Sequence, residues 1–225
     1  MRSAQTWQNT EHNQTAGDSR MLKLAPKLKA IMKQEYPRFS EKEYARRHRA
    51  LEGLMQKNGL DTMLIVTENR SGNATQWVTG WPGTVEAFVV FRPGEKMWMT
   101  VEWVNHYPLA AKICAHMDVV WGEHRGPEKL LAELKRRGAK RIGVMGPLRV
   151  AKYRALEEHF TLVPLDREYT RLRMIKSEEE IDWIRIGAAM SDAGFAALLK
   201  GTKPGLTERE LGAIVESAYI KEGGT

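Results

Sequence analysis

The feature that most constrains how this chain folds is an alternation of short apolar runs with amphipathic stretches between residues 36 and 170. The runs "TMLIV", "DVVW", "RIGVM" and "TLVPL" have the length and composition of buried strands. Helical patterns such as "GPEKLLAELKRRG" and "RVAKYRALEEHF" lie between them. The alternation predicts an α/β domain whose sheet is covered by helices.

Two further strands are predicted around a turn. The runs "VEAFVVF" and "KMWMTV" flank the turn sequence "RPGE", which is typical of two strands joined in an antiparallel pair. Because crossover helices join the remaining strands, and such connections produce parallel neighbours, we expect a mixed sheet.

The helix before the first strand carries its own boundary signals. In "FSEKEYARRHRALEGLMQKNGLD", Ser40 is placed to cap the helix and Glu43 to complete a capping box. Gly59 is placed to end the helix in the left-handed conformation. The residues predicted to face inward are Tyr44, Leu51, Leu54 and Met55.

Two more helices are predicted close to residue 225. The first begins at Glu178, after Ser177 and Glu180 form a capping box, and ends at Gly201. Its predicted buried face is Ile181, Ile184, Ala188, Phe195 and Leu198. The second begins after Thr207, with Glu210 in another capping box and with Leu211, Ile214, Val215 and Ala218 as its apolar face. If no sheet covers these helices, we expect them to pair with each other, to pair with another copy, or to aggregate.

Composition narrows the classes of protein that remain. Apolar residues make up 42% of the chain, which is enough for a packed core. The single cysteine, Cys114, lies in the apolar run "LAAKICAH" and is predicted to be buried and unreactive. No run approaches about 18 apolar residues, and "MRSAQTWQNTEHNQTAGDSR" lacks a signal core. We therefore predict a cytoplasmic protein with no membrane partner.

The net charge of +7 is concentrated at the beginning of the chain. Residues 1–60 contain twelve Lys and Arg against six acidic residues, whereas residues 61–225 are nearly balanced. No regular ladder of aromatic residues interleaves with these cations and no nucleic-acid-binding motif appears, so nucleic acid is an unlikely partner. The polar, aperiodic residues 1–20 predict a tail, and we assign residues 1–35 to a flexible N-terminal extension.

The order of these segments resembles the creatinase and prolidase family, whose members include proline-specific aminopeptidases and dipeptidases with the pita-bread fold. The resemblance rests on "FSEKEYARRHRALEGLMQKNGLDTMLI", "NATQWVTGW", the "RPGE" hairpin, "RIGVM" and "LRMIKSEEEIDWIRIGAAMSDAGFAALL" followed by "KPGLTERELGAIVE". It implies a creatinase-type N-terminal domain over residues 36–170. Residues 171–225 would then be the start of an incomplete pita-bread domain.

The family's catalytic residues are not expected among these 225. By resemblance, a pair of divalent metal ions is held by two aspartates, one histidine and two glutamates downstream of the two helices. We therefore assign no catalytic residue, no metal ligand and no bound cofactor to this chain. The resemblance also implies a homodimer. It further implies a peptide or small-molecule substrate only where the catalytic domain is complete.

Other candidate sites have simpler interpretations. His106, His116 and His124 lack the spacing of a zinc motif, and the acidic residues of "SEEEID" are explained by a helix N-terminus. In the turn-rich stretch "NATQWVTGWPG", Trp77 and Trp81 are the substrate-proximal candidates. In relatives, the corresponding region approaches the pocket of the dimer partner. Packing in the core is the alternative for both rings.

Two functions remain open. The first is the N-terminal portion of a metal-dependent Xaa-Pro peptidase or related C–N hydrolase, inactive alone. The second is a non-catalytic module for dimerisation or protein interaction, derived from the same family. The sequence does not define the substrate, the metal, the oligomeric state, or whether Met1 or Met21 is the start.

Overall fold

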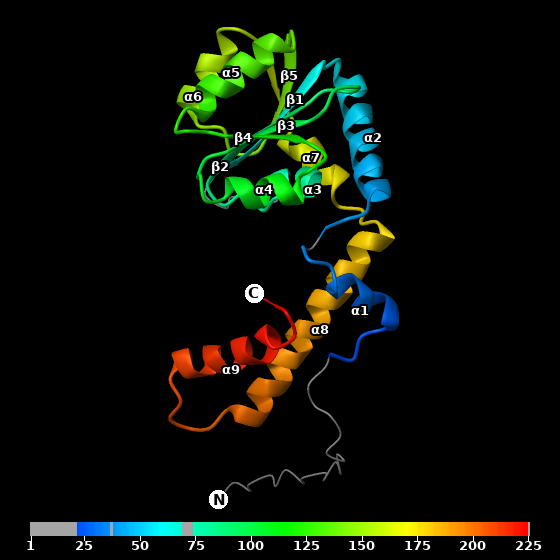
Figure 1. Cartoon of the computed structure of the whole chain (residues 1–225), viewed down its shortest axis with the longest axis vertical. Coiled ribbons are helices and arrows are strands. Elements are labelled where there is room, and N and C mark those ends of the chain that lie inside the picture. Colours follow the sequence, from blue (N-terminus) through cyan, green and yellow to red (C-terminus); the bar gives the residue numbers. More distant parts are fainter. Residues whose placement is uncertain (1–21, 37, 69–73, 225) are drawn as a thin grey trace, which may run out of the picture. The chain divides into compact units, whose positions relative to one another are not determined.

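The computed structural model describes residues 22–36, 38–68 and 74–224. These residues fall into two compact units, one of residues 33–181 and the other of residues 22–32 with residues 182–224. The predicted tail at residues 1–20 lies outside the described residues. Figure 1 labels most of the elements of each unit.

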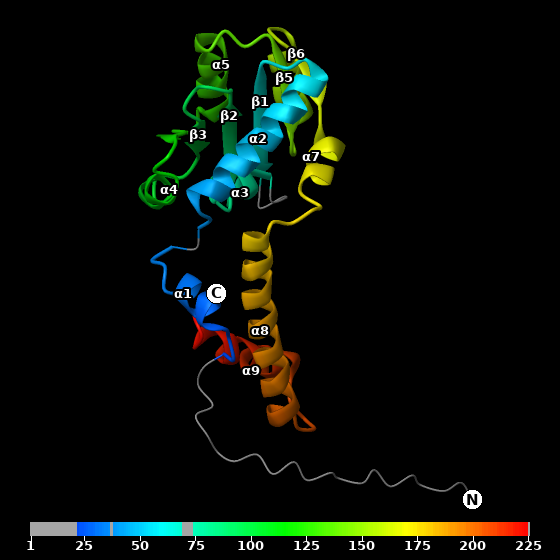
Figure 2. The ribbon, with the colours of Figure 1, turned by 90° about the vertical axis from the view of Figure 1, so that its right-hand side faces the viewer.

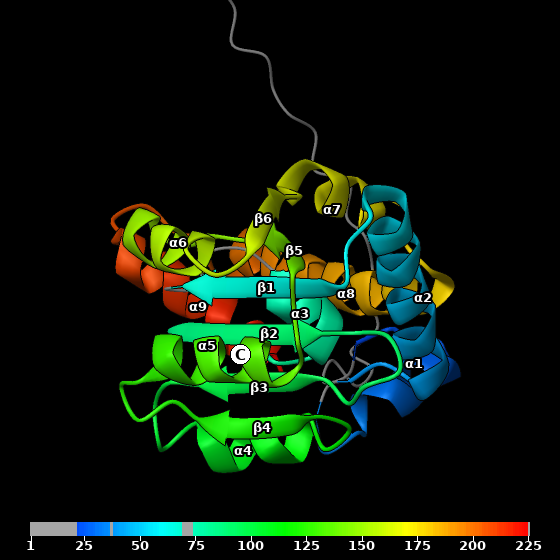
Figure 3. The ribbon, with the colours of Figure 1, turned by 90° about the horizontal axis from the view of Figure 1, so that it is seen from above.

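A mixed sheet of six strands forms the centre of the larger unit. Its strands lie in the order β4-β3-β2-β1-β5-β6, and Figure 3 shows them side by side. The β1–β2 and β2–β3 pairs are antiparallel and the other three pairs are parallel, which confirms the predicted mixed sheet and its hairpin. The bounds are β1 Thr62–Glu68, β2 Glu86–Phe91, β3 Trp98–Val101, β4 Asp118–Trp121, β5 Arg141–Met145 and β6 Thr161–Pro164.

Helices cover both faces of this sheet. One face packs against α2 (Glu41–Asn58), α3 (Ala74–Thr79), α4 (Tyr107–Ile113) and α7 (Asp166–Leu172). The other face packs against α5 (Gly126–Arg136) and α6 (Val150–Glu157). The predicted α/β class is therefore confirmed.

Two of these helices differ from the prediction. The stretch "NATQWVTGW", interpreted as a loop, contains α3, in which five of six residues are buried. Helix α7 was not predicted. Its central residue Tyr169 is buried and donates through its hydroxyl to the Ala74 carbonyl at 2.6 Å. Both helices are about two turns long, so tertiary contacts rather than periodicity determine them.

The period of two along β1 divides the core into its two layers. Met63 and Ile65 face the α2 side, whereas Leu64 and Val66 face the α5 side, and none of the four is more than 1% exposed. Burying each such side chain is worth roughly 1.5–3 kcal/mol. Cys114 also lies in the α2-side core and is fully buried, as predicted.

The smaller unit consists of α1 (Pro26–Met32), most of α8 (Glu178–Gly201), and α9 (Glu208–Ile220). The bounds of α8 and the capping boxes of α8 and α9 agree with the sequence prediction. Helix α1 falls within the predicted flexible extension, and it is ordered by burial of Leu22 and Leu28. Figure 2 shows α8 as one continuous helix.

The predicted buried face of α8 is wrong in its central part. Ile184 and Phe195 are 52% and 67% exposed and Ala188 is exposed too, whereas Asp182, Ile186 and Gly194 are the buried residues. The apolar spacing identifies a stripe, but the neighbouring elements determine which stripe is covered. No helix in the described part of the chain is long and apolar enough to cross a membrane.

A glycine at the end of β5 provides a test of the sheet. Gly146 has φ +91°, and a Cβ there would lie 2.0 Å from the Val66 carbonyl oxygen. Gly146→Ala is expected to lower the free energy of unfolding by about 3 kcal/mol, combining left-handed strain with overpacking. Gly138→Ala is the matched control, because Gly138 has φ +64° with nothing within 4 Å, and strain alone predicts about 1–2 kcal/mol. Urea unfolding measures both values, and equal losses would contradict the packing argument.

Candidate functional site

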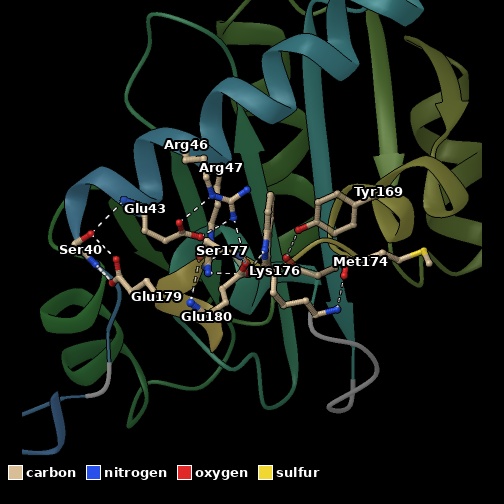
Figure 4. A network of polar contacts seen from close by, with 12 residues as sticks. Ser40, Glu43, Arg46, Arg47, Tyr169, Met174, Lys176, Ser177, Glu179 and Glu180 are labelled. Atoms are coloured by element: carbon tan, nitrogen blue, oxygen red, sulfur yellow. Dashed lines mark hydrogen bonds and ion pairs between the residues drawn. The ribbon is translucent and has the colours of Figure 1, made fainter. Parts of the chain in front are cut away.

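A buried arginine on α2 is the centre of the polar network that Figure 4 shows. Arg47 is 0% exposed, and its guanidinium donates from three nitrogens. Nε donates to Glu43 Oε1 at 2.7 Å, Nη1 to the Trp77 carbonyl at 2.6 Å, and Nη2 to Glu180 Oε1 at 2.9 Å. The buried charge is thus paired with two carboxylates that lie 4 and 133 residues away in sequence.

Aromatic rings enclose the same guanidinium. Its central carbon lies 3.8 Å from the centroid of the Phe39 ring and 5.1 Å from that of Trp77. Both distances are within the range of a cation–π interaction, which strengthens when the cation is removed from water. Lysine would not replace Arg47, because the planar fork and its stacking are both used here.

Glu180 connects this cation to the start of α8. Its Oε1 accepts from Arg47 and also from Trp77 Nε1 at 2.9 Å. Its Oε2 accepts from the Ser177 backbone at 2.8 Å and from Arg46 Nη2 at 3.2 Å. The capping box predicted for α8 is therefore also the contact that joins α8 to α2 and α3.

Glu179, the residue before Glu180, contributes to the N-terminal cap of α2. Ser40 Oγ accepts from the Glu43 amide at 3.2 Å, as predicted for the N-terminus of α2. The reciprocal bond predicted for Glu43 is wrong, because the Ser40 amide and hydroxyl donate to Glu179 instead. Glu43 turns toward Arg46 and Arg47, so a residue from α8 completes the cap of α2.

The charges of the network support each other electrostatically. Burial by itself would raise the pKa of Glu43, but hydrogen bonds from Arg46 and Arg47 outweigh it and hold that pKa below the ordinary 4.5. Glu43 is therefore ionised at neutral pH. The protein groups that surround Arg47 satisfy its donors, so this site positions helices and offers no free nucleophile or base.

The two tryptophan candidates lie next to this network. Trp77 is 8% exposed, and its ring packs edge-on against the Tyr169 ring, with 5.6 Å between the ring centroids. Trp81 is 4% exposed, and its ring centroid lies 6.0 Å from that of His106. In this chain both rings therefore pack in the interior, and their approach to a substrate remains a prediction.

The histidines are dispersed. His106 bonds through Nδ1 to Thr84 Oγ1 at 2.8 Å, and His124 pairs with Glu102 at 2.8 Å. His116 stacks on Tyr44, with the ring centroids 5.0 Å apart. Within residues 22–36, 38–68 and 74–224, no three His, Cys, Asp or Glu side chains are placed to hold a metal ion. These residues therefore do not fit the metal pair that the resemblance implies.

Cys114 is a free cysteine in the core, so its reactivity as a nucleophile has to be considered. Its thiol donates to the Thr79 carbonyl at 3.2 Å, and burial raises its pKa to about 12. The thiol therefore stays protonated at neutral pH, as expected for an unreactive buried cysteine.

Comparison with known proteins identifies the family. The sequence model of the Creatinase/Prolidase N-terminal domain matches residues 47–175, which is more than half of the chain. The chain therefore belongs to the creatinase/prolidase family. The uncharacterized peptidase YqhT of Bacillus subtilis (strain 168) is 28% identical over 165 residues, covering 70% of this chain and 44% of YqhT.

Solved structures share the fold. An Xaa-Pro dipeptidase from Bacillus anthracis matches with a TM-score of 0.64 at 20% identity, covering 79% of this chain and 49% of that one. An X-Pro aminopeptidase from Thermotoga maritima MSB8 matches with a TM-score of 0.69 at 20% identity, covering 78% and 49%. This chain thus spans about half the length of these relatives.

Substitution of Glu180 is predicted to lower the free energy of unfolding strongly. Glu180→Gln is expected to lower the free energy of unfolding by about 2–4 kcal/mol, because it removes one of two carboxylates from a fully buried guanidinium. Glu178→Gln is the matched control, since it lies in the same helical turn and is exposed. Its expected change is within about 0.5 kcal/mol. Urea unfolding decides, and similar losses for the two variants would contradict the assignment.

His48 predicts how stability depends on pH. Its Nε2 is buried without a hydrogen-bond partner, and burial lowers its pKa below the ordinary 6.5, although Glu52 opposes this. Because the folded-state pKa of His48 is lowered, the unfolded chain binds the proton at a higher pH than the folded chain does. The contribution of neutral His48 to the free energy of unfolding is therefore fully present above pH 6.5 and is lost as the pH falls below it. His48→Leu should flatten this fall. His116, whose pKa burial also lowers, should maintain part of it. Unfolding free energies at pH 7.5 and about 5.5 measure the slope, and an unchanged slope would contradict the prediction.

Proposed function

We propose that this chain is the N-terminal portion of a metal-dependent hydrolase that acts on Xaa-Pro peptides or a related C–N bond. The family match to residues 47–175 is the observation that carries the proposal. The names of the solved relatives, an Xaa-Pro dipeptidase and an X-Pro aminopeptidase, support this substrate class. In this proposal residues 33–181 are non-catalytic, and α8 and α9 lead into the catalytic part.

The network around Arg47 supports this division of roles. It uses its carboxylates to fix helices, with Glu180 bonded to Arg46, Arg47, Trp77 and Ser177. A family hydrolase instead needs carboxylates that are free to bind metal ions, which activate water and stabilise the oxyanion. We therefore propose that those ligands belong to the part of the fold that follows α9.

The proposal predicts no activity from the 225 residues alone. Purified chain incubated with Mn²⁺ and an Xaa-Pro dipeptide should release no proline above the rate without protein. Release that a chelator abolishes would overturn the proposed division, because it would place a working metal site within these residues.

A non-catalytic interaction module is the second candidate, and one surface favours it. In the turn after β3 and the first turn of α4, four apolar side chains are exposed: Trp103 (49%), Val104 (58%), Tyr107 (37%) and Leu109 (41%). Neighbouring exposed apolar side chains are typical of protein interfaces, with aromatic residues as their anchors. A second copy of the chain is the partner that the family resemblance implies, so we propose a homodimer through this surface.

Substitution at this surface tests the homodimer. Trp103→Ser should weaken self-association about tenfold or more, in the range of an aromatic anchor at an interface. Val150→Ser is the control, because Val150 is 69% exposed on α6. Sedimentation velocity of both variants and of the unchanged chain decides, and equal oligomeric states for all three would exclude this interface.

A further inference from the structure

One short sequence pattern, a glutamate followed three and four residues later by arginines, occurs on two helices of the larger unit. It is "EYARR" at residues 43–47 of α2 and "ELKRR" at residues 133–137, where α5 ends. Residues three and four apart lie on the same face of a helix, so each copy brings one carboxylate beside two guanidinium groups. The two copies can therefore be compared bond by bond.

The copy on α2 is the one at the centre of Figure 4. Arg46 donates to both oxygens of Glu43, from Nε at 2.9 Å and from Nη2 at 2.7 Å. Arg47 Nε donates to Glu43 Oε1 at 2.7 Å, and Arg47 Nη1 donates to the Trp77 backbone carbonyl at 2.6 Å. The second arginine is thus fixed by a glutamate of its own helix and by a carbonyl of another element.

The copy on α5 makes the same set of bonds. Arg136 donates to both oxygens of Glu133, from Nε at 2.8 Å and from Nη2 at 2.7 Å. Arg137 Nε donates to Glu133 Oε1 at 2.6 Å, and Arg137 Nη2 donates to the Lys96 backbone carbonyl at 2.9 Å. The side chain of Arg137 is 2% exposed, so this second arginine is buried like Arg47.

A second carboxylate completes the copy on α2. Glu180 Oε1 accepts from Arg47 Nη2 at 2.9 Å, and Glu180 Oε2 accepts from Arg46 Nη2 at 3.2 Å. One glutamate and two arginines carry one excess positive charge, which Glu180 neutralises. Glu180 lies in the first turn of α8, so the element that docks on this arginine pair is an acidic helix N-terminus.

The copy on α5 lacks an equivalent of Glu180 among the residues that the structure describes. Glu95 Oε2 lies 3.2 Å from Arg137 Nη1, but this buried nitrogen has no hydrogen-bond partner in the described part of the chain. The other oxygen of Glu95 pairs with Arg92 at 3.3 Å rather than with Arg136. The Arg136 side chain is 65% exposed, whereas that of Arg46 is 36% exposed. Glu95 therefore balances part of the charge without spanning both guanidinium groups.

The charges around the α5 pair favour an added carboxylate. Hydrogen bonds from Arg136 and Arg137, opposed by burial, hold the pKa of Glu133 below the ordinary 4.5, so this carboxylate is ionised at neutral pH. Asp118 pairs with Lys96 at 2.7 Å, and Glu95 pairs with Arg92 and Arg137. Four cations thus face three carboxylates, and the excess positive charge remains at the exposed Arg136.

We propose that Arg136 and Arg137 form a docking site for an acidic helix N-terminus of a partner protein, one carboxylate of which bridges both arginines as Glu180 bridges Arg46 and Arg47. The planar forks of two arginines match the two oxygens of a carboxylate, which explains the preference for this group. Glu95 yields its place at Arg137 when the partner binds. This inference does not depend on the proposed enzymatic role.

A peptide from the chain itself is the probe. A synthetic peptide of residues 174–189 carries the acidic N-terminus of α8, and in the intact chain the α2 pair already holds Glu180. Titrated into the ¹⁵N-labelled whole chain, it should shift backbone amide signals of residues 92–96 and 133–138 in NMR spectra. The same peptide with glutamine at positions 178–180 should leave these signals unchanged.

Substitutions with opposite expected effects test the assignment of residues. Arg136→Gln should weaken binding of the acidic peptide about fivefold, the size of one exposed ion pair. Arg154→Gln is the matched control, because it removes the same charge from an exposed arginine on α6. Glu95→Gln should strengthen binding about twofold or more, since it removes the competing carboxylate. Glu157→Gln, at an exposed glutamate of α6, is its control.

The result that overturns the site is an acidic peptide that shifts no signal of residues 92–96 and 133–138, or that shifts only those around the α2 pair. Equal weakening by Arg136→Gln and Arg154→Gln would also overturn it, because attraction to the net charge would then suffice. Equal effects of Glu95→Gln and Glu157→Gln would overturn the displacement of Glu95. Identical shifts from sodium acetate at the same carboxylate concentration would overturn the choice of a protein partner.

Discussion

The structure depends on one constraint, which is that a guanidinium with no exposure to water requires charged partners. Arg47 satisfies this requirement with Glu43 from its own helix and Glu180 from α8. Removing one partner of such a buried pair typically destabilises a protein by about 3–5 kcal/mol, because the remaining charge is left uncompensated. The ion pairs thus specify where the N-terminus of α8 must lie on the α/β unit.

This constraint explains the boundary between the two compact units. The larger unit extends to Ile181, so the first turn of α8 belongs to it. Ser177 and Glu180 begin the helix, while Glu179 caps α2 through Ser40. The acidic cluster "SEEEID", which was assigned to a helix N-terminus alone, therefore has a second role in tertiary structure.

The sequence predicted those features that local chemistry determines. Apolar runs identified the six strands, and the capping residues Ser177 and Thr207 located the starts of α8 and α9. Contacts between distant residues were not predictable in this way. Glu179 replaces Glu43 in the cap of α2 from 139 residues away, and no local pattern distinguishes these two carboxylates. The covered stripe of α8 depended on α1 and α9, which the spacing of Ile184 and Phe195 does not reveal. At the candidate site, Trp77 lies next to the network, and its approach to a substrate stays a prediction. Arg47 was not predicted, because no local pattern in "EYARRHRA" distinguishes a buried arginine from an exposed one.

A double-mutant cycle between Arg47 and Glu180 tests the central claim most directly. Urea unfolding of Arg47→Met, Glu180→Gln and the double variant gives the coupling energy between the two side chains without assuming the value of either alone. The account predicts that the double variant is more stable than the sum of the single losses implies, with a coupling of about 1–3 kcal/mol. Single losses that add to within about 0.5 kcal/mol would contradict it, because the two residues would then act independently.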